Sequence, residues 1–230
     1  MLVGCGRYGL DPLPDARAIG DAARCAIDGV ACDDHNICTT SSSCAGGTCV
    51  GAGDPHCTVA RSMDQFSQTQ GENGWYYGFW DITDDADGVY EPSEFVLGAT
   101  FEGLWRPTNW KPDPDPDFTW AYLAPWGGHP GSFPLVRASI RRWVSTVEGD
   151  AIARVTHAKS DTSGGDGTRA ILVVDGVLLL SRDVAGDDGV GFTEDVPITL
   201  EVGSTVDLLL HCITDDSIDT TEQSMDILSP

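Results

Sequence analysis

Short apolar stretches separated by turn-forming residues run along the chain from residue 60 to its end. No sustained amphipathic run of helix-forming residues occurs there, so short strands joined by turns are expected. Ile171–Val174 and Leu208–Leu210 are apolar without alternation, as in central strands covered on both faces. Asp175-Gly176 predicts a tight hairpin. The pattern predicts about ten strands: Gly74–Trp80, Glu94–Thr100, Phe118–Leu123, Leu135–Thr146, Ala151–Lys159, Arg169–Val174, Val177–Arg182, Val196–Val202, Thr205–Thr214 and Gln223–Leu228.

This arrangement is typical of an all-β fold with two packed sheets. The strand at Gly74–Trp80 is the most aromatic, because five rings fall in six positions after the turn formed by residues 71–74. One face of this strand must belong to the core. The other face is either covered by a second layer or offered to a ligand.

The composition changes sharply in front of the expected sandwich, where cysteines stand among small and polar residues. Such a segment has too few apolar residues for a core of its own, so we expect disulfides, and hence an oxidising compartment. Six cysteines allow about 15 pairings, and the sequence does not choose among them. A zinc site is the weaker alternative, since no Cys-x-x-Cys motif occurs. The cysteines concerned are Cys25, Cys32, Cys38, Cys44, Cys49 and Cys57.

We therefore divide the chain into a start and linker over residues 1–24, a small disulfide-rich and loop-dominated segment over 25–59, and a sandwich over 60–230. Cys212 lies in an apolar run and is expected to be a small buried hydrophobe, with pairing to Cys5 as the alternative.

Residues 2–5 resemble the lipobox that ends a bacterial lipoprotein signal peptide, although the basic and apolar segments that precede such a box are missing. The resemblance implies a lipid on Cys5, a tether to the bilayer, and an extracellular or cell-surface location. The alternative is a chance tetrapeptide with Cys5 in a disulfide.

Acidic residues outnumber basic ones by 36 to 13, which gives a formal net charge of −23. This charge repels nucleic acids and anionic membrane surfaces, and it favours Ca²⁺. We therefore expect no nucleic-acid partner.

One acidic stretch has the spacing of a calcium-binding loop once Gly88 is placed at its sixth position. A bound Ca²⁺ would relieve the repulsion among the carboxylates. The alternative is a solvated acidic turn. The acidic loops at residues 161–167 and 183–189 are candidates for further calcium sites, although such loops are more often plain turns. The predicted ligands are Thr83, Asp85, Asp87, the Val89 carbonyl, Glu91 and Glu94.

Several tryptophans stand beside proline-rich loops, where an indole ring can face solvent and stack on the C–H face of a sugar. The alternative is that these rings close the ends of the sandwich. Arg141, next to Trp143, is expected to make a cation–π contact or pair with a carboxylate. The candidate glycan-binding residues are Trp110, Trp126, Asp113, Asp115 and Arg142.

The order of motifs from residue 66 to residue 228 is similar to a jelly-roll module of secreted proteins from environmental bacteria. These motifs are residues 69–78, 126–130, 141–143 and 164–167, followed by the strand and turn at 171–176. The module looks like the galactose-binding-like and carbohydrate-binding sandwiches. Residues 28–49 resemble the short Cys-rich repeats of secreted myxobacterial proteins. These resemblances imply a jelly-roll β-sandwich that binds sugars or adheres without catalysis.

Signs of catalysis are few, because the chain has no Gly-x-Ser-x-Gly elbow, no phosphate loop and no histidines at metal-ligand spacing. We expect a calcium-stabilised carbohydrate-binding or adhesive module, secreted or anchored at the cell surface. One alternative is a structural subunit of an extracellular layer or filament that assembles through the Cys-rich segment. The other is a polysaccharide lyase or hydrolase, with His129 as base and Tyr76 or Tyr77 as its partner.

Overall fold

The computed structural model describes residues 25–32, 39–53, 57–108, 120–132 and 135–229, which belong to two compact units. One unit comprises the Cys-rich residues up to 52, and the other extends from residue 53 to the C-terminal end. The described regular structure is all β apart from two 3-10 turns, η1 (Glu72–Gly74) and η2 (Pro92–Glu94). Within these ranges, no helix has the length and hydrophobicity needed to cross a bilayer.

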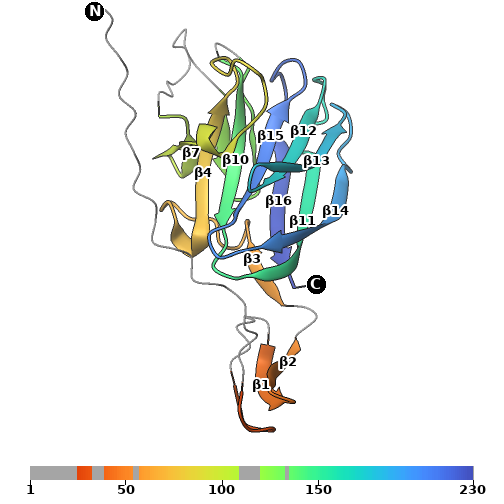
Figure 1. Ribbon diagram of the computed structural model, residues 1–230. Helices are drawn as coiled ribbons and strands as arrows, with labels where there is room; N and C mark the ends of the chain where they lie inside the picture. Colours follow the sequence, from red (N-terminus) through yellow and green to blue (C-terminus); the bar gives the residue numbers. More distant parts are fainter. Residues whose placement is uncertain (1–24, 33–38, 54–56, 109–119, 133–134, 230) are drawn as a thin grey trace, which may run out of the picture. The chain divides into compact units, whose positions relative to one another are not determined.

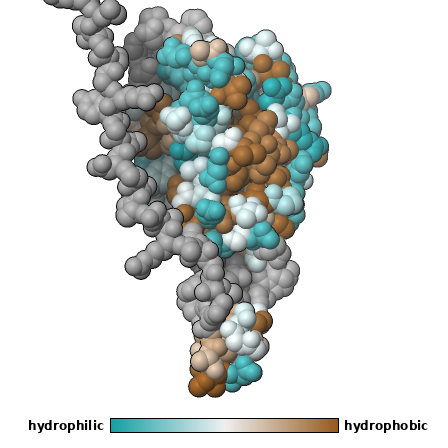
Figure 2. Space-filling view, in the orientation of Figure 1, coloured by the Kyte–Doolittle hydropathy of each residue, from teal (hydrophilic) through white to brown (hydrophobic). Residues whose placement is uncertain are grey.

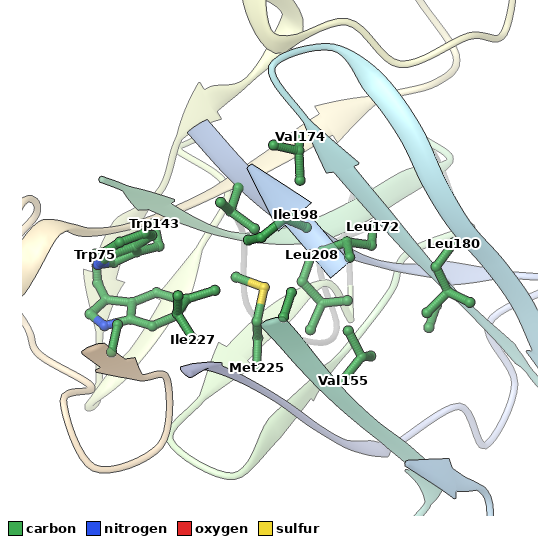
Figure 3. Close-up of a cluster of buried hydrophobic side chains, with 14 of the residues drawn as sticks. Trp75, Trp143, Val155, Leu172, Val174, Leu180, Ile198, Leu208, Met225 and Ile227 are labelled. Atoms are coloured by element: carbon green, nitrogen blue, oxygen red, sulfur yellow. The ribbon is translucent and has the colours of Figure 1, made fainter. Parts of the chain in front are cut away.

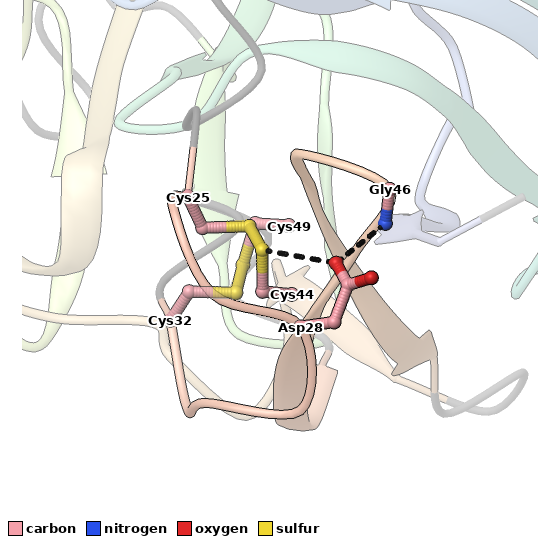
Figure 4. Close-up of a disulfide and its surroundings, with 6 residues drawn as sticks. All are labelled: Cys25, Asp28, Cys32, Cys44, Gly46 and Cys49. Carbon is pink, nitrogen blue, oxygen red and sulfur yellow. Dashed lines mark hydrogen bonds between the residues drawn. A yellow bond between two sulfur atoms is a disulfide. The ribbon is translucent and has the colours of Figure 1, made fainter.

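The Cys-rich unit is a hairpin of β1 (Thr39–Ala45) and β2 (Thr48–Gly53) held by disulfides (Figure 4). Cys25 is bonded to Cys44 and Cys32 to Cys49, which confirms the expected disulfides for these four residues. Cys57 is disulfide-bonded as well, whereas Cys38 and Cys5 lie outside the described residues. The disulfides are consistent with an extracellular location.

The larger unit is a β-sandwich of two antiparallel sheets (Figure 1). The first sheet has the order β13 (Val177–Val184), β12 (Thr168–Val174), β15 (Thr205–Cys212), β10 (Arg137–Val144), β4 (Trp75–Asp81) and β5 (Val96–Leu97). The second sheet has the order β14 (Phe192–Leu200), β11 (Gly149–Lys159), β16 (Thr221–Leu228), β9 (Gly127–His129), β8 (Tyr122–Ala124), β7 (Leu104–Arg106) and β6 (Ala99–Phe101), and β3 (Thr58–Arg61) also pairs with β16.

From β9 onward the chain changes sheet at every connection except the β12–β13 hairpin, as expected for a jelly roll. That hairpin confirms the turn predicted at residues 175–176. Asp175 and Gly176 have φ values of 48° and 82°, and positive φ at both central residues is the requirement of a type I′ turn.

The main core lies between the sheets, and ten of its side chains are labelled in Figure 3. Leu172 and Leu208 from the first sheet meet Met225 and Ile227 from the second, and all four are fully buried. A smaller apolar cluster on the outer face of the first sheet includes Trp80, Tyr90, Ile140, Val173 and Leu209. The two clusters explain why the central runs of β12 and β15 are apolar on both faces.

Strand β4 is therefore covered on both sides. Trp75 and Tyr77 belong to the main core, and Trp80 packs in the outer cluster, where its ring centroid lies 5.5 Å from that of Tyr90. Of the two alternatives for the second face of this strand, the structure shows the covered one.

Candidate functional site

An open pocket of about 340 Å³ lies where strands β8 and β9 meet the loop between β15 and β16. Strand pairing assembles it, because Tyr122 of β8 stands opposite His129 of β9 and Gly128 stands opposite Thr221 at the start of β16. The pocket is lined by Trp120, Tyr122, His129, Asp216, Ser217, Ile218 and Thr220.

Aromatic rings form one side of this pocket. His129 is stacked on Tyr122 at a centroid distance of 5.9 Å, and Trp120 lies 6.1 Å from His129. The ring of Trp126 meets that of Tyr122 edge to face, with a centroid distance of 6.3 Å. The guanidinium carbon of Arg106 lies 5.0 Å from the centroid of the Tyr122 ring. Trp120 is 51% exposed and Trp126 is 39% exposed, so both indoles reach solvent.

Glycines allow the two short strands to fit together. A Cβ on Gly127 would lie 1.9 Å from the Thr221 carbonyl oxygen, and a Cβ on Gly128 would lie 2.4 Å from the Tyr122 carbonyl oxygen. The Gly127-Gly128 pair therefore lets β9 pass between β8 and β16, and this close approach brings His129 to the pocket.

His129 presents a defined hydrogen-bonding pattern. Its Nδ1 lies 2.6 Å from the Pro130 carbonyl oxygen, which can only accept, so Nδ1 carries the proton and Nε2 of the neutral ring is an acceptor. Burial lowers the pKa of His129 and raises the pKa of Tyr122. Both rings are therefore uncharged near neutral pH.

Asp216 supplies the carboxylate of the pocket. Its Oδ1 accepts a hydrogen bond from the Ser132 hydroxyl, whose oxygen accepts one from the Asp216 amide at 3.0 Å. Its Oδ2 is buried without a hydrogen-bond partner among the described residues.

A second hollow of about 250 Å³ is lined by Phe79, Asp81, Val96, Leu97, Pro107, Thr108 and Arg137. Its two charged side chains pair with each other, with Arg137 Nη2 3.1 Å from Asp81 Oδ2. Figure 2 also shows an apolar area on one face of the molecule. The exposed apolar side chains of the sandwich include Val177 and Leu178 of the edge strand β13. Neither place combines exposed indoles with polar groups as the first pocket does.

The predicted glycan-binding residues are only partly brought together. Trp126 adjoins the ring-lined pocket, whereas Trp110, Asp113 and Asp115 lie outside the described residues. Arg142 lies on another part of the sandwich. It donates to both carboxylate oxygens of Asp207 at 2.7 and 2.8 Å, to the Tyr90 hydroxyl and to the Pro92 carbonyl.

Arg141 also differs from expectation. Its side chain is fully buried, it donates to the carbonyls of Ala124 and Gly127, and its guanidinium lies 5.7 Å from the Phe66 ring centroid. Its aromatic contact is thus with Phe66, and its hydrogen bonds direct the guanidinium toward β8 and β9.

The predicted calcium ligands are engaged in local turns. Asp85 and Asp87 each accept a hydrogen bond from the amide two residues further on, and Glu91 and Glu94 form a capping box around η2. The Thr83 hydroxyl accepts from the Val136 amide, and Val89 is exposed. Among the residues that the structure describes, no three His, Cys, Asp or Glu side chains are grouped as a metal site. Calcium binding stays a prediction.

Cys212 is a buried free cysteine, as expected for a small apolar residue, and burial raises the pKa of its thiol to about 12.

Sequence reasoning missed Trp120, Tyr122 and Asp216 as members of one site. The available signal was the hairpin spacing between residues 122 and 129, with Gly127 and Gly128 inside it. His129 was singled out, but the tyrosine beside it is Tyr122 and not Tyr76 or Tyr77.

No protein-family model matches the sequence, and no curated protein is similar to it. Among solved structures, a β-glucosidase from Kluyveromyces marxianus aligns with 71% of this chain and 17% of its own, at 10% identity and a TM-score of 0.34. The same enzyme in complex with glucose aligns with 70% of this chain and 16% of its own, at 10% identity and a TM-score of 0.30. The chain spans less than a fifth of either structure, and these scores are too low to support any argument about function.

Proposed function

We propose that this protein is a non-catalytic, extracellular carbohydrate-binding module and that its binding site is the pocket between β8, β9 and the β15–β16 loop. The observation that carries the proposal is the presence of two exposed indoles at the stacked Tyr122 and His129 rings: Trp120 lines the pocket and lies 6.1 Å from His129, and Trp126 lies 6.3 Å from Tyr122. Sugars present flat C–H faces that pack on such rings.

The polar groups of the pocket complement sugar hydroxyls. His129 Nε2 is an acceptor, and the polar residues Asp216, Ser217 and Thr220 line the same pocket. A few polar groups that fix orientation beside an apolar wall are the usual composition of a small-ligand site.

The charge of the site favours a neutral glycan over a uronic-acid polymer. Tyr122 and His129 are both uncharged near neutral pH, Asp216 adds a carboxylate, and the whole chain carries a formal charge of −23. A negatively charged sugar would be repelled by this field. The proposal therefore specifies neutral polysaccharides or oligosaccharides.

The test is binding of the full chain to an array of neutral and uronic-acid glycans, followed by titration of each glycan that binds. Trp120→Ala and Trp126→Ala should each weaken binding about three- to tenfold, the loss expected for one ring contact. Val202→Ala is the matched control, because Val202 is 66% exposed and lies at the other end of β15 from the pocket.

Binding that both tryptophan variants retain at full strength would remove this pocket as the site. Absence of binding to every neutral glycan, or a preference for uronic acids, would contradict the proposed ligand class.

A further inference from the structure

A lysine and an aspartate are enclosed together beneath the β15–β16 loop. Lys159 is the last residue of β11, and Asp219 precedes β16 in the loop that also supplies residues to the pocket. Both side chains are 0% exposed, and Lys159 Nζ lies 2.7 Å from Asp219 Oδ1. Lys159 Nζ also donates to the Ile218 carbonyl oxygen. The pair is thus held in contact and shielded from bulk water.

A second carboxyl group faces the same enclosure. Both oxygens of Asp166, in the loop between β11 and β12, are buried without a hydrogen-bond partner among the described residues, and so is Asp219 Oδ2. The backbone next to Asp166 packs on the pair, since a Cβ on Gly165 would lie 3.3 Å from Asp219 Oδ1 and 2.5 Å from the Ser217 carbonyl oxygen. Leaving three carboxylate oxygens buried without a donor is costly, and the loss of one carboxylate charge would lower that cost.

Burial raises the pKa of Asp219 to about 6, against the opposing effect of Lys159, and the charge of Asp166 raises it further. Amide formation requires the neutral acid and the neutral amine, and the 2.7 Å contact lets a proton pass directly from Lys159 Nζ to Asp219. A neutral amine is a nucleophile, and holding it against a carboxyl group replaces a bimolecular encounter by an intramolecular one.

We propose that Lys159 and Asp219 condense to an intramolecular amide bond, assisted by Asp166. Lys159 Nζ attacks the Asp219 carboxyl carbon, and a C–N bond replaces a C–O bond. Asp166 accepts a proton from the attacking nitrogen and delivers it to the departing hydroxyl, which leaves as water. In sum, one ammonium and one carboxylate give one amide and one water molecule, with no oxidant, reductant or cofactor.

The bond would join the end of β11 covalently to the loop that carries Asp216, Ser217 and Thr220. It would fix that side of the pocket in place by closing a ring of the chain between residues 159 and 219. The proposal stands apart from sugar binding, because the cross-link forms whether or not a glycan binds.

Intact-mass spectrometry of the full chain tests it directly. After reduction of the disulfides, the mass is expected to be lower than that of the unmodified chain by one water molecule. Asp-Gly sequences such as Asp175-Gly176 can also lose water by forming a succinimide, so a tryptic digest is the deciding measurement. An amide on Lys159 blocks cleavage there and joins residues 155–169 to residues 183–230 in a single product.

Lys159→Arg is the matched control, because arginine keeps the buried positive charge but lacks the amine of lysine. It should have the full mass calculated from its own sequence and give residues 155–159, 160–169 and 183–230 as three separate peptides. Asp166→Asn keeps both reacting groups and should leave most of the freshly purified protein unlinked. Separate peptides 155–159, 160–169 and 183–230 from the unaltered protein would overturn the proposal without recourse to any variant. A full cross-link in Asp166→Asn would remove Asp166 from the reaction.

Discussion

Replacement of Asp207 by alanine should destabilise the sandwich far more than the loss of an exposed carboxylate. The Asp207 side chain is 0% exposed and that of its partner Arg142 is 13% exposed. Asp207 accepts hydrogen bonds from Arg142 Nε and Nη2 and, at 2.9 Å, from the Tyr90 hydroxyl. In Asp207→Ala the guanidinium and the phenol lose these acceptors while both remain largely buried.

Removal of one partner from a buried ion pair costs about 3 to 5 kcal/mol. The chain supplies a matched comparison in Arg154 and Asp195, which form an ion pair of similar geometry with an Nε–Oδ1 distance of 2.6 Å but with side chains 46% and 45% exposed. Exposed pairs contribute about 0 to 1 kcal/mol. For a domain of this size, about 2 to 4 °C of melting temperature correspond to 1 kcal/mol. Asp207→Ala should therefore lower Tm by about 6 to 20 °C, and Asp195→Ala by about 4 °C at most.

Thermal unfolding with the disulfides intact measures the Tm of both variants, with tryptophan fluorescence as the signal. Trp80 lies 5.5 Å from Tyr90 and reports on the affected region. Burial raises the pKa of the Tyr90 phenol, and the nearby Asp207 carboxylate raises it further. Ultraviolet titration of this phenol should therefore show a lower pKa in Asp207→Ala. Equal losses of stability in the two variants would refute the assignment of Arg142 and Asp207 to an internal structural pair.

Three further predictions concern other parts of the chain. Burial lowers the pKa of His157 to about 4. Between pH 6.5 and pH 4 this histidine binds a proton in the unfolded chain but not in the folded protein, so the free energy of unfolding should fall by up to about 3 kcal/mol over that range. The Tm of His157→Gln should depend less on pH than that of the wild type. Gly127→Ala places a methyl group against the Thr221 carbonyl, so this variant should unfold at lower urea concentration than the wild type and lose glycan binding. If the loop at residues 83–94 binds Ca²⁺, millimolar calcium should raise the Tm of the wild type and not that of Asp85→Ala, and equal responses would contradict a site there.

Most of the sandwich could be predicted because local patterns dictate it. Each of the ten expected strands overlaps an observed strand, and the Asp175-Gly176 turn has the backbone that its residues favour. The short strands β3, β7 and β9 were missed. They contain three or four residues each, and pairing with neighbours rather than their own composition makes them strands.

The candidate site was harder to predict because it depends on contacts between distant parts of the chain. Tyr122 and Asp216 are far apart in sequence, and only the order of strands β8, β9 and β16 places them in one pocket. Arg142 illustrates the opposite error. Its position beside Arg141 and Trp143 gave no sign of Asp207, which stands opposite it on the neighbouring strand β15.

In two places a buried ion pair helps to attach a loop to the sandwich, and the second of these loops lines the candidate site. Arg142 and Asp207 lie on paired strands of the first sheet and hold Tyr90, which belongs to the loop between β4 and β5. Lys159 at the end of β11 holds the β15–β16 loop through Asp219. Both loops are rich in aspartate, and the β4–β5 loop also packs Ile82, Tyr90 and Phe95 in the outer apolar cluster. A buried cation presented by the sheet gives such a loop a specific attachment point, and in the second case the attached loop forms one wall of the aromatic pocket.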